Sequence, residues 1–286
     1  MPLQWFHWAI LIPLAVLAFY YSYPKIENFF VFFPEKRLEF LPEAFGLAHR
    51  DIYFRSEDGK MLHGWFFQGK RGDPVILHFH GNAGNISHRL DLIKRLVQKE
   101  VQIFIIDYRG FGRSEGRPSE RGVYLDGLAA YDYLVQREGI PAEDIVLHGH
   151  SLGAAVAVEV ALKRAVKSVI LESAFTSTRG MAKTLPLFAL FAPVLPAHYN
   201  NLEKLTRLSV PILIVHGDQD ETVPFLMGER LFAAASEPKE FLRVPGAGHN
   251  DTYVVGGRPY LEAIKGFAEK PVIQPHDVDP LPKGGR

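Results

Sequence analysis

Short apolar runs alternate along this chain with longer segments in which apolar residues recur every three or four positions. A short apolar run bounded by turn residues predicts a buried strand, whereas the longer spacing predicts an amphipathic helix. The sequence therefore predicts buried strands just before Gly149 and at 74–79, 101–106, 167–172, 211–216 and 240–244. It predicts helices at about 87–99, 120–136, 152–163, 224–235 and 258–269.

The order of these elements favours one fold class. Strands that alternate with helices are typical of an α/β fold with a mostly parallel, doubly wound sheet. Segments 50–55 and 61–68, joined by an Asp58-Gly59 turn, predict an antiparallel pair in front of it. With 286 residues and 47% hydrophobic content, the chain can bury one large core. We therefore expect a single catalytic domain at 49–270.

The alternation is interrupted between residues 175 and 208. The stretch 185–197 is strongly apolar, contains three prolines and shows no strand pattern. At about 13 residues it is too short to cross a membrane. We expect a small apolar cap at about 175–208 that covers the site, and an irregular tail at 271–286.

The longest apolar stretch lies at the amino terminus. Residues 3–23 carry no formal charge, and as a helix they would extend about 31 Å, enough to cross a hydrocarbon core. No Lys or Arg precedes the stretch and no small-x-small site follows it, which argues against a cleaved signal peptide. We expect a single-pass membrane anchor at 1–24, with a soluble core helix as the alternative.

The juxtamembrane segment expected at 25–48 bears on orientation. Lys25, Lys36 and Arg37 follow the apolar stretch, and the positive-inside rule then favours a cytoplasmic catalytic domain. The segment also holds a cluster of phenylalanines that would lie in the membrane interface or pack on the domain: Phe29, Phe30, Phe32 and Phe33.

Charge and composition exclude several classes of function. The 32 basic and 32 acidic residues balance and no basic run occurs, so we expect no nucleic-acid partner. The absence of cysteine excludes a Cys nucleophile and a Cys-ligated metal. His78 and His80 share a strand face without a further ligand at metal-binding spacing, and the 110–116 loop lacks the Gly-Lys-Ser/Thr ending of a phosphate loop. We expect no metal and no cofactor.

The stretch from Gly149 to Gly153 lies between a predicted strand and a predicted helix. A serine at the tip of such a turn adopts a strained backbone, and glycines two residues to either side let strand and helix approach. The helix amino terminus behind the serine favours negative charge. Ser151 is therefore the candidate nucleophile, although the bare pattern also occurs as a turn without chemistry.

A serine hydroxyl needs a base to take its proton and an acid to orient that base. Asp220 follows the predicted strand 211–216, at the edge where a carboxylate can reach a histidine. Its rivals lie in the same turn or after the preceding strand: Asp218, Glu221 and Glu172. His249, in a glycine-rich loop after the last predicted strand, is the candidate base. Other histidines flank strand ends and are expected to be structural: His148, His150 and His216.

Acyl transfer also needs N–H donors aimed at the developing oxyanion. One is expected from Leu152, the residue after the nucleophile, and the other from the loop at 80–85. We assign the second donor to Asn82, with Ala83 as the alternative. The competing interpretation is a glycine-rich turn that only caps a helix.

Six motifs in this order resemble the α/β-hydrolase superfamily: HFHGNAGNISHR, DYRGFGRSEGRPSE, GHSLGAAVA, LESAFTS, HGDQDETVP and GAGHNDT. Over about residues 25–268 the chain looks most like the membrane-anchored branch typified by α/β-hydrolase domain-containing protein 13. The resemblance implies an α/β-hydrolase fold, an N-terminal hydrophobic anchor, and a triad of Ser151, Asp220 and His249. One departure is Gly153-Ala154, where many members have two glycines.

Together these features predict a membrane-anchored serine hydrolase that cleaves carboxylic esters or thioesters of acyl or lipid substrates through an acyl-enzyme on Ser151. A peptidase acting on short peptides or aminoacyl amides is the alternative within the same fold, although no acidic clamp for a peptide amino terminus is recognisable. A non-catalytic membrane scaffold is the third possibility, and it would not need all three triad residues.

Overall fold

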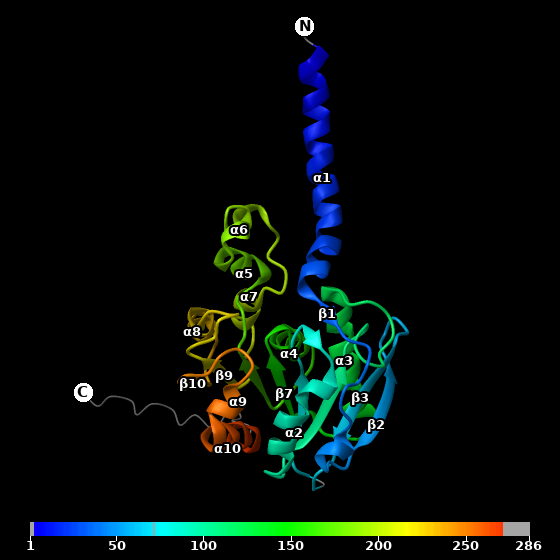
Figure 1. The fold of residues 1–286 in the computed structure, drawn as a ribbon, viewed down its shortest axis with the longest axis vertical. Coiled ribbons are helices and arrows are strands. Elements are labelled where there is room, and N and C mark those ends of the chain that lie inside the picture. Colours follow the sequence, from blue (N-terminus) through cyan, green and yellow to red (C-terminus); the bar gives the residue numbers. More distant parts are fainter. Residues whose placement is uncertain (1–2, 71, 271–286) are drawn as a thin grey trace, which may run out of the picture.

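The computed structural model describes residues 3–70 and 72–270. At its centre lies an eight-stranded sheet with the strand order β10-β9-β8-β7-β4-β6-β3-β2 (Figure 1). Along this order, neighbours from β10 to β6 are parallel, whereas β3 is antiparallel to both β6 and β2. The strands are β2 (Arg50–Arg55), β3 (Met61–Phe67), β4 (Val75–Phe79), β6 (Gln102–Asp107), β7 (Ile145–His150), β8 (Ser168–Glu172), β9 (Ile212–Gly217) and β10 (Lys239–Val244).

Helices pack on both faces of this sheet. Successive side chains of a strand point to opposite faces, so in β4 Leu77 joins one buried cluster with residues of α3 and α4, and Ile76 joins another with residues of α2 and α10. Burial on both faces explains why the sequences of the strands are nearly continuous apolar runs. The helices are α2 (Leu90–Val97), α3 (Glu120–Gln136), α4 (Leu152–Lys163), α8 (Phe225–Ala234), α9 (Thr252–Val255) and α10 (Gly257–Glu269).

The mostly parallel sheet predicted from the sequence is confirmed. The strands whose bounds were predicted begin and end within one residue of those bounds. The helix expected at 87–99 differs more, because it opens with a 3₁₀ turn at Ile86–Arg89 before α2 begins. The Asn85 side chain accepts from the N–H of Ser87 and caps that turn.

The segment expected as a cap consists of short helices: α5 (Thr178–Thr184), α6 (Pro186–Ala189), a 3₁₀ turn (Ala192–Val194) and α7 (Asn201–Leu205). Pro186 occupies the first turn of α6, where its missing N–H loses no hydrogen bond. Leu187 and Leu190 are 76% and 82% exposed, so this segment turns apolar side chains outward. The segment stands beside α1 (Figure 1), and the rings of Phe188 and Phe30 contact at 6.0 Å between centroids.

Helix α1 (Leu3–Val31) projects from the domain (Figure 1). It continues past the boundary expected at residue 24, and Tyr23 and Glu27 near its end are buried beside His198 of the segment expected as a cap. Within the described residues, no helix combines the length and the apolar character needed to cross a membrane. The transmembrane anchor expected at 1–24 therefore has no support in the structure.

The remaining expectations at the two ends of the chain have different outcomes. Of the four clustered phenylalanines, Phe32 is buried in the core beside Phe111 and Tyr199, whereas Phe29, Phe30 and Phe33 are exposed. The tail expected at 271–286 lies outside the described residues.

Candidate active site

A sharp turn between β7 and α4 presents Ser151 at the carboxyl edge of the sheet. Ser151 has φ +53° and ψ −114°, a strained conformation for a residue with a side chain. A Cβ on Gly149 would lie 2.5 Å from the Cα of Ala154, and a Cβ on Gly153 would lie 1.9 Å from the carbonyl oxygen of Phe79. Only glycine therefore allows α4 to approach β7 and β4 this closely.

The structure brings Ser151, His249 and Asp220 together. His249 Nε2 lies 3.1 Å from Ser151 Oγ, and His249 Nδ1 lies 2.8 Å from Asp220 Oδ2. All three residues are buried. Because an ionised carboxylate only accepts hydrogen bonds, Nδ1 carries the proton in this arrangement and Nε2 is left to accept from the serine hydroxyl.

Several groups hold Asp220 in place. Its Oδ1 accepts from the backbone N–H groups of Thr222 and Val223 at 2.9 and 2.7 Å, and His216 Nε2 lies 3.3 Å from its Oδ2. Burial raises the pKa of this carboxyl, but the hydrogen bonds from His216 and His249 outweigh burial, so the pKa of Asp220 lies below its usual value. Asp220 is therefore ionised at neutral pH and can orient His249.

The rival acids have other partners or surroundings. Asp218 pairs with Arg243 at 2.8 Å, and Glu221 is exposed. Glu172 is buried at the end of β8, where its carboxylate accepts from His148 Nε2 at 2.8 Å. Asp220 is thus the acid that the structure puts in contact with the candidate base.

The two expected oxyanion donors lie on segments that flank Ser151. Leu152 opens α4, so its N–H is one of the amino-terminal N–H groups that lack an acceptor within the helix. The loop after β4 also passes close by, because a Cβ on Gly81 would lie 3.6 Å from the Cβ of Ser151. Asn82 and Ala83 follow directly in that loop. Their role as the second donor stays a prediction.

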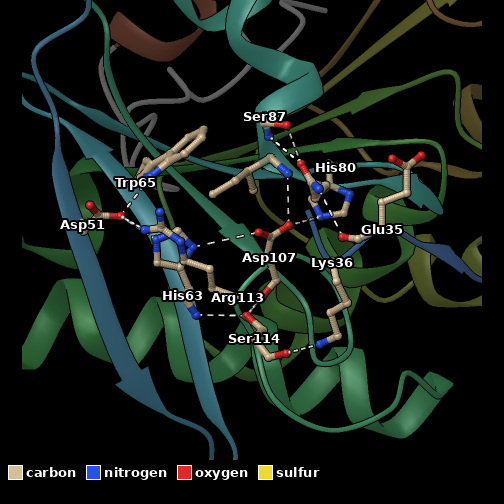
Figure 2. Close-up of polar contacts among 12 residues, drawn as sticks. Glu35, Lys36, Asp51, His63, Trp65, His80, Ser87, Asp107, Arg113 and Ser114 are labelled. Carbon is tan, nitrogen blue, oxygen red and sulfur yellow. Dashed lines mark hydrogen bonds and ion pairs between the residues drawn. The ribbon is translucent and has the colours of Figure 1, made fainter. Parts of the chain in front are cut away.

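A buried carboxylate anchors the continuation of this loop (Figure 2). Asp107, at the end of β6, is fully buried and accepts from the N–H of Ile86 at 3.0 Å, while its main-chain oxygen accepts from Ser114 Oγ at 2.6 Å. His80 Nε2 and His63 Nδ1 face its side chain at 3.6 and 4.0 Å. Burial raises the pKa of Asp107, but the two histidines hold it below its usual value.

The sequence did not indicate which residues fix the loop that carries His249. His150 Nε2 donates to the main-chain oxygen of His249 at 2.9 Å. Thr252, three residues after His249, donates to Glu172, and Tyr260 of α10 donates to the same carboxylate at 2.9 Å. The sequence held one signal for these contacts, the charged residue Glu172 at the end of the apolar strand 167–172. A carboxylate buried at such a position needs hydrogen-bond partners.

Comparisons with known proteins extend over most of the chain. It is 36% identical over 251 residues to the α/β-hydrolase domain-containing protein WAV2 of Arabidopsis thaliana, covering 80% of this chain and 81% of that protein. The chain belongs to the α/β-hydrolase superfamily. This α/β-hydrolase is also 31% identical over 282 residues to protein bem46 of Schizosaccharomyces pombe, with 93% of both chains covered. The resemblance stated from the six motifs is thereby confirmed.

Two further comparisons concern a family and a fold. A family described as serine aminopeptidase, S33, matches residues 71–205 of this α/β-hydrolase. Among solved structures, the esterase Pf2001 of Pyrococcus furiosus superposes with a TM-score of 0.70 at 19% identity, covering 85% of this chain and 98% of that one. At this identity the likeness establishes the α/β-hydrolase fold alone.

Proposed function

We propose that this chain is a serine hydrolase that cleaves carboxylic esters or thioesters through an acyl-enzyme on Ser151. The observation that carries the proposal is the hydrogen-bonded chain from Ser151 Oγ through His249 to Asp220, with the serine on a strained turn. A buried, ionised carboxylate and a histidine in one fixed tautomer are what a base for a serine hydroxyl requires.

The reaction follows from this order of groups. His249 Nε2 takes the hydroxyl proton as Ser151 Oγ attacks the substrate carbonyl carbon, and Asp220 stabilises the resulting imidazolium. The N–H groups of Leu152 and Asn82 bind the oxyanion. When the carbon–oxygen or carbon–sulfur bond breaks, His249 returns the proton to the leaving group. It then takes a proton from a water molecule that attacks the acyl carbon. As the bond from that carbon to Ser151 Oγ breaks, His249 gives this proton to Oγ, so the acid leaves and the serine hydroxyl is restored.

The cap supports acyl or lipid groups as the substrate class. Its α6 is built from apolar residues, and Leu187 and Leu190 of this segment are exposed. Apolar surface of this kind favours hydrocarbon chains because burying them removes water from both partners. The fold shared with the Pyrococcus furiosus esterase is consistent with ester substrates.

Hydrolysis of p-nitrophenyl esters from acetate to palmitate tests the proposal, with Ser151→Ala measured beside the wild type. The variant should lower kcat by about 10⁴- to 10⁶-fold. Ser168→Ala is a matched control, because Ser168 is buried in β8 and its Oγ has no hydrogen-bond partner among the described residues. Near wild-type turnover by Ser151→Ala would overturn the assignment.

A peptidase is the second candidate, favoured by the description of the family that matches residues 71–205. The same triad can cleave amides, because the acyl-enzyme chemistry is shared. Turnover of aminoacyl p-nitroanilides by the wild type, exceeding that of acyl esters and lost in Ser151→Ala, would favour this candidate over an esterase.

A further inference from the structure

The segment that follows α1 pairs with the loop expected to form the oxyanion hole. Strand β1 (Phe33–Pro34) lies parallel to β5 (Ala83–Gly84) in a separate two-stranded sheet. The N–H of Phe33 donates to the carbonyl oxygen of Asn82 at 2.9 Å, and the N–H of Glu35 donates to that of Gly84 at 3.0 Å. About fifty residues of chain separate the two partners, so this is a tertiary contact.

The side chain of Asn82 makes a second contact with the same segment. Its Nδ2 donates to the carbonyl oxygen of Val31 at 2.7 Å. Residues 31–33 therefore hold both the main-chain oxygen and the side chain of Asn82. The planar peptide unit of the Asn82 carbonyl also contains the N–H of Ala83, so the bond from Phe33 sets the direction of that N–H. Together with the side-chain contact, it also fixes the position of the Asn82 Cα, which is bonded to the Asn82 amide nitrogen.

The segment is itself anchored to neighbouring loops (Figure 2). The carbonyl oxygen of Glu35 accepts from the N–H of Gly112 at 2.8 Å and from Asn85 Nδ2 at 3.1 Å. Asn85 Nδ2 also donates to the carbonyl oxygen of Arg37 at 2.7 Å, and Lys36 Nζ donates to that of Ser114 at 2.7 Å. A segment fixed at this many points can hold a catalytic donor without moving itself.

We propose that residues 31–37 are a positioning element of the active site, which holds the donor loop at Asn82 and Ala83 in register with Ser151. This inference rests on the proposed serine hydrolase function. It assigns a role in catalysis to a segment that precedes the alternating strands and helices of the domain and carries no catalytic group. A transition-state donor needs such support, because a displacement of about 1 Å can cost roughly 100-fold in rate.

Phe33→Pro tests the inference in the full chain, with Phe33→Ala as the matched control. Proline removes the N–H that donates to Asn82, whereas alanine keeps that N–H and loses only a ring that is 55% exposed. We expect Phe33→Pro to lower kcat by about 10- to 100-fold while KM changes little, because the oxyanion forms after substrate binding. Phe33→Ala should keep wild-type kcat.

The affinity for an alkylboronic acid inhibitor distinguishes a positioning role from a merely structural one, which would leave this affinity unchanged. The boronate bound to Ser151 is tetrahedral and its oxygen occupies the oxyanion position, so its affinity should fall in proportion to kcat in Phe33→Pro. The affinity for the carboxylate product should stay unchanged. Circular dichroism compares the folding of the two Phe33 variants.

Asn82→Ala decides the question if Phe33→Pro does not fold. This variant keeps the backbone N–H but loses the contact with Val31, so kcat should fall by about 10-fold. Wild-type kcat in Asn82→Ala, or in a folded Phe33→Pro variant, would overturn the positioning role. If Ser151→Ala also kept full activity, the proposed function itself would fail, so the two failures are distinguishable.

Discussion

Replacing Gly153 by alanine perturbs the contact between α4 and β4 on which the serine turn depends. The added Cβ would lie 1.9 Å from the carbonyl oxygen of Phe79 and 2.8 Å from that of His80. Both are backbone atoms, so no side chain can rotate away, and α4 must move by roughly 1.5 Å to restore an ordinary contact. Overpacking of a core typically costs about 1–3 kcal/mol, and we expect a loss near 3 kcal/mol here.

The same shift should also lower activity. Ser151 and Leu152 lie at the amino terminus of α4 and would move with it, so the proposed nucleophile and its neighbouring N–H would leave their positions relative to His249. A displacement of about 1 Å already corresponds to a kcat loss of about 100-fold, so we expect a loss of at least that size. Urea unfolding and p-nitrophenyl ester hydrolysis measure the two effects on the same protein.

Gly266→Ala is the matched control. Gly266 lies in α10 and is exposed, and a Cβ there would meet no atom within 4 Å. The substitution should stabilise the protein by about 0.5–1 kcal/mol, because alanine favours a helix over glycine. A Gly153→Ala protein with the urea midpoint and turnover of the wild type would refute the packing argument.

Three further predictions concern ionisable groups. Asp220→Asn should lower kcat about 10⁴-fold, because an amide can select the wrong tautomer of His249; steady-state rates would contradict this if they stayed near those of the wild type. Arg109→Ala should lower the free energy of unfolding in urea by about 3–5 kcal/mol, because the buried Asp126 carboxylate loses its bidentate partner. A change below about 1 kcal/mol would refute this. Burial lowers the pKa of His150 to about 4, so between its unfolded value of 6.5 and about 4 the unfolded chain binds more protons and stability should fall as pH falls, by up to about 1.4 kcal/mol per pH unit. A urea midpoint that rose across this range on acidification would contradict the last prediction.

Burial on both faces explains why the sheet could be predicted from the sequence. A strand covered on two sides must be apolar at nearly every position, as β4 and β9 are, and such runs stand out between polar turns. Strand β1 could not be found in this way. It has two residues, its side chains are exposed, and only its backbone pairs with the loop after β4. No pattern of side chains marks a contact made by backbone atoms alone.

The positions of the triad candidates could also be predicted from the sequence. Ser151, Asp220 and His249 each follow a predicted strand, and the ends of parallel strands meet at one edge of the sheet. The same rule could not predict which residues α1 contacts. Its apolar composition indicated a membrane span, whereas the buried contact of Glu27 with His198 depends on where the cap lies in space.

Glu172 shows why a carboxylate beside a histidine does not by itself indicate catalysis. Glu172 accepts from His148 Nε2 at 2.8 Å, the same distance that joins Asp220 to His249. The main-chain oxygen of Glu172 also accepts from the N–H of Ser151 at 2.9 Å, so this residue lies next to the serine turn on the neighbouring strand β8.

The two carboxylate–histidine pairs differ at the second nitrogen of the imidazole. His148 Nδ1 faces His78 Nδ1 at 3.1 Å inside the sheet, whereas His249 Nε2 faces the hydroxyl of Ser151. Burial raises the pKa of Glu172, but the hydrogen bond from His148 lowers it to about 2, so Glu172 is ionised in the core at neutral pH. A histidine acts as a base only where its free nitrogen reaches a group that can give up a proton, and in this protein His249 meets that condition.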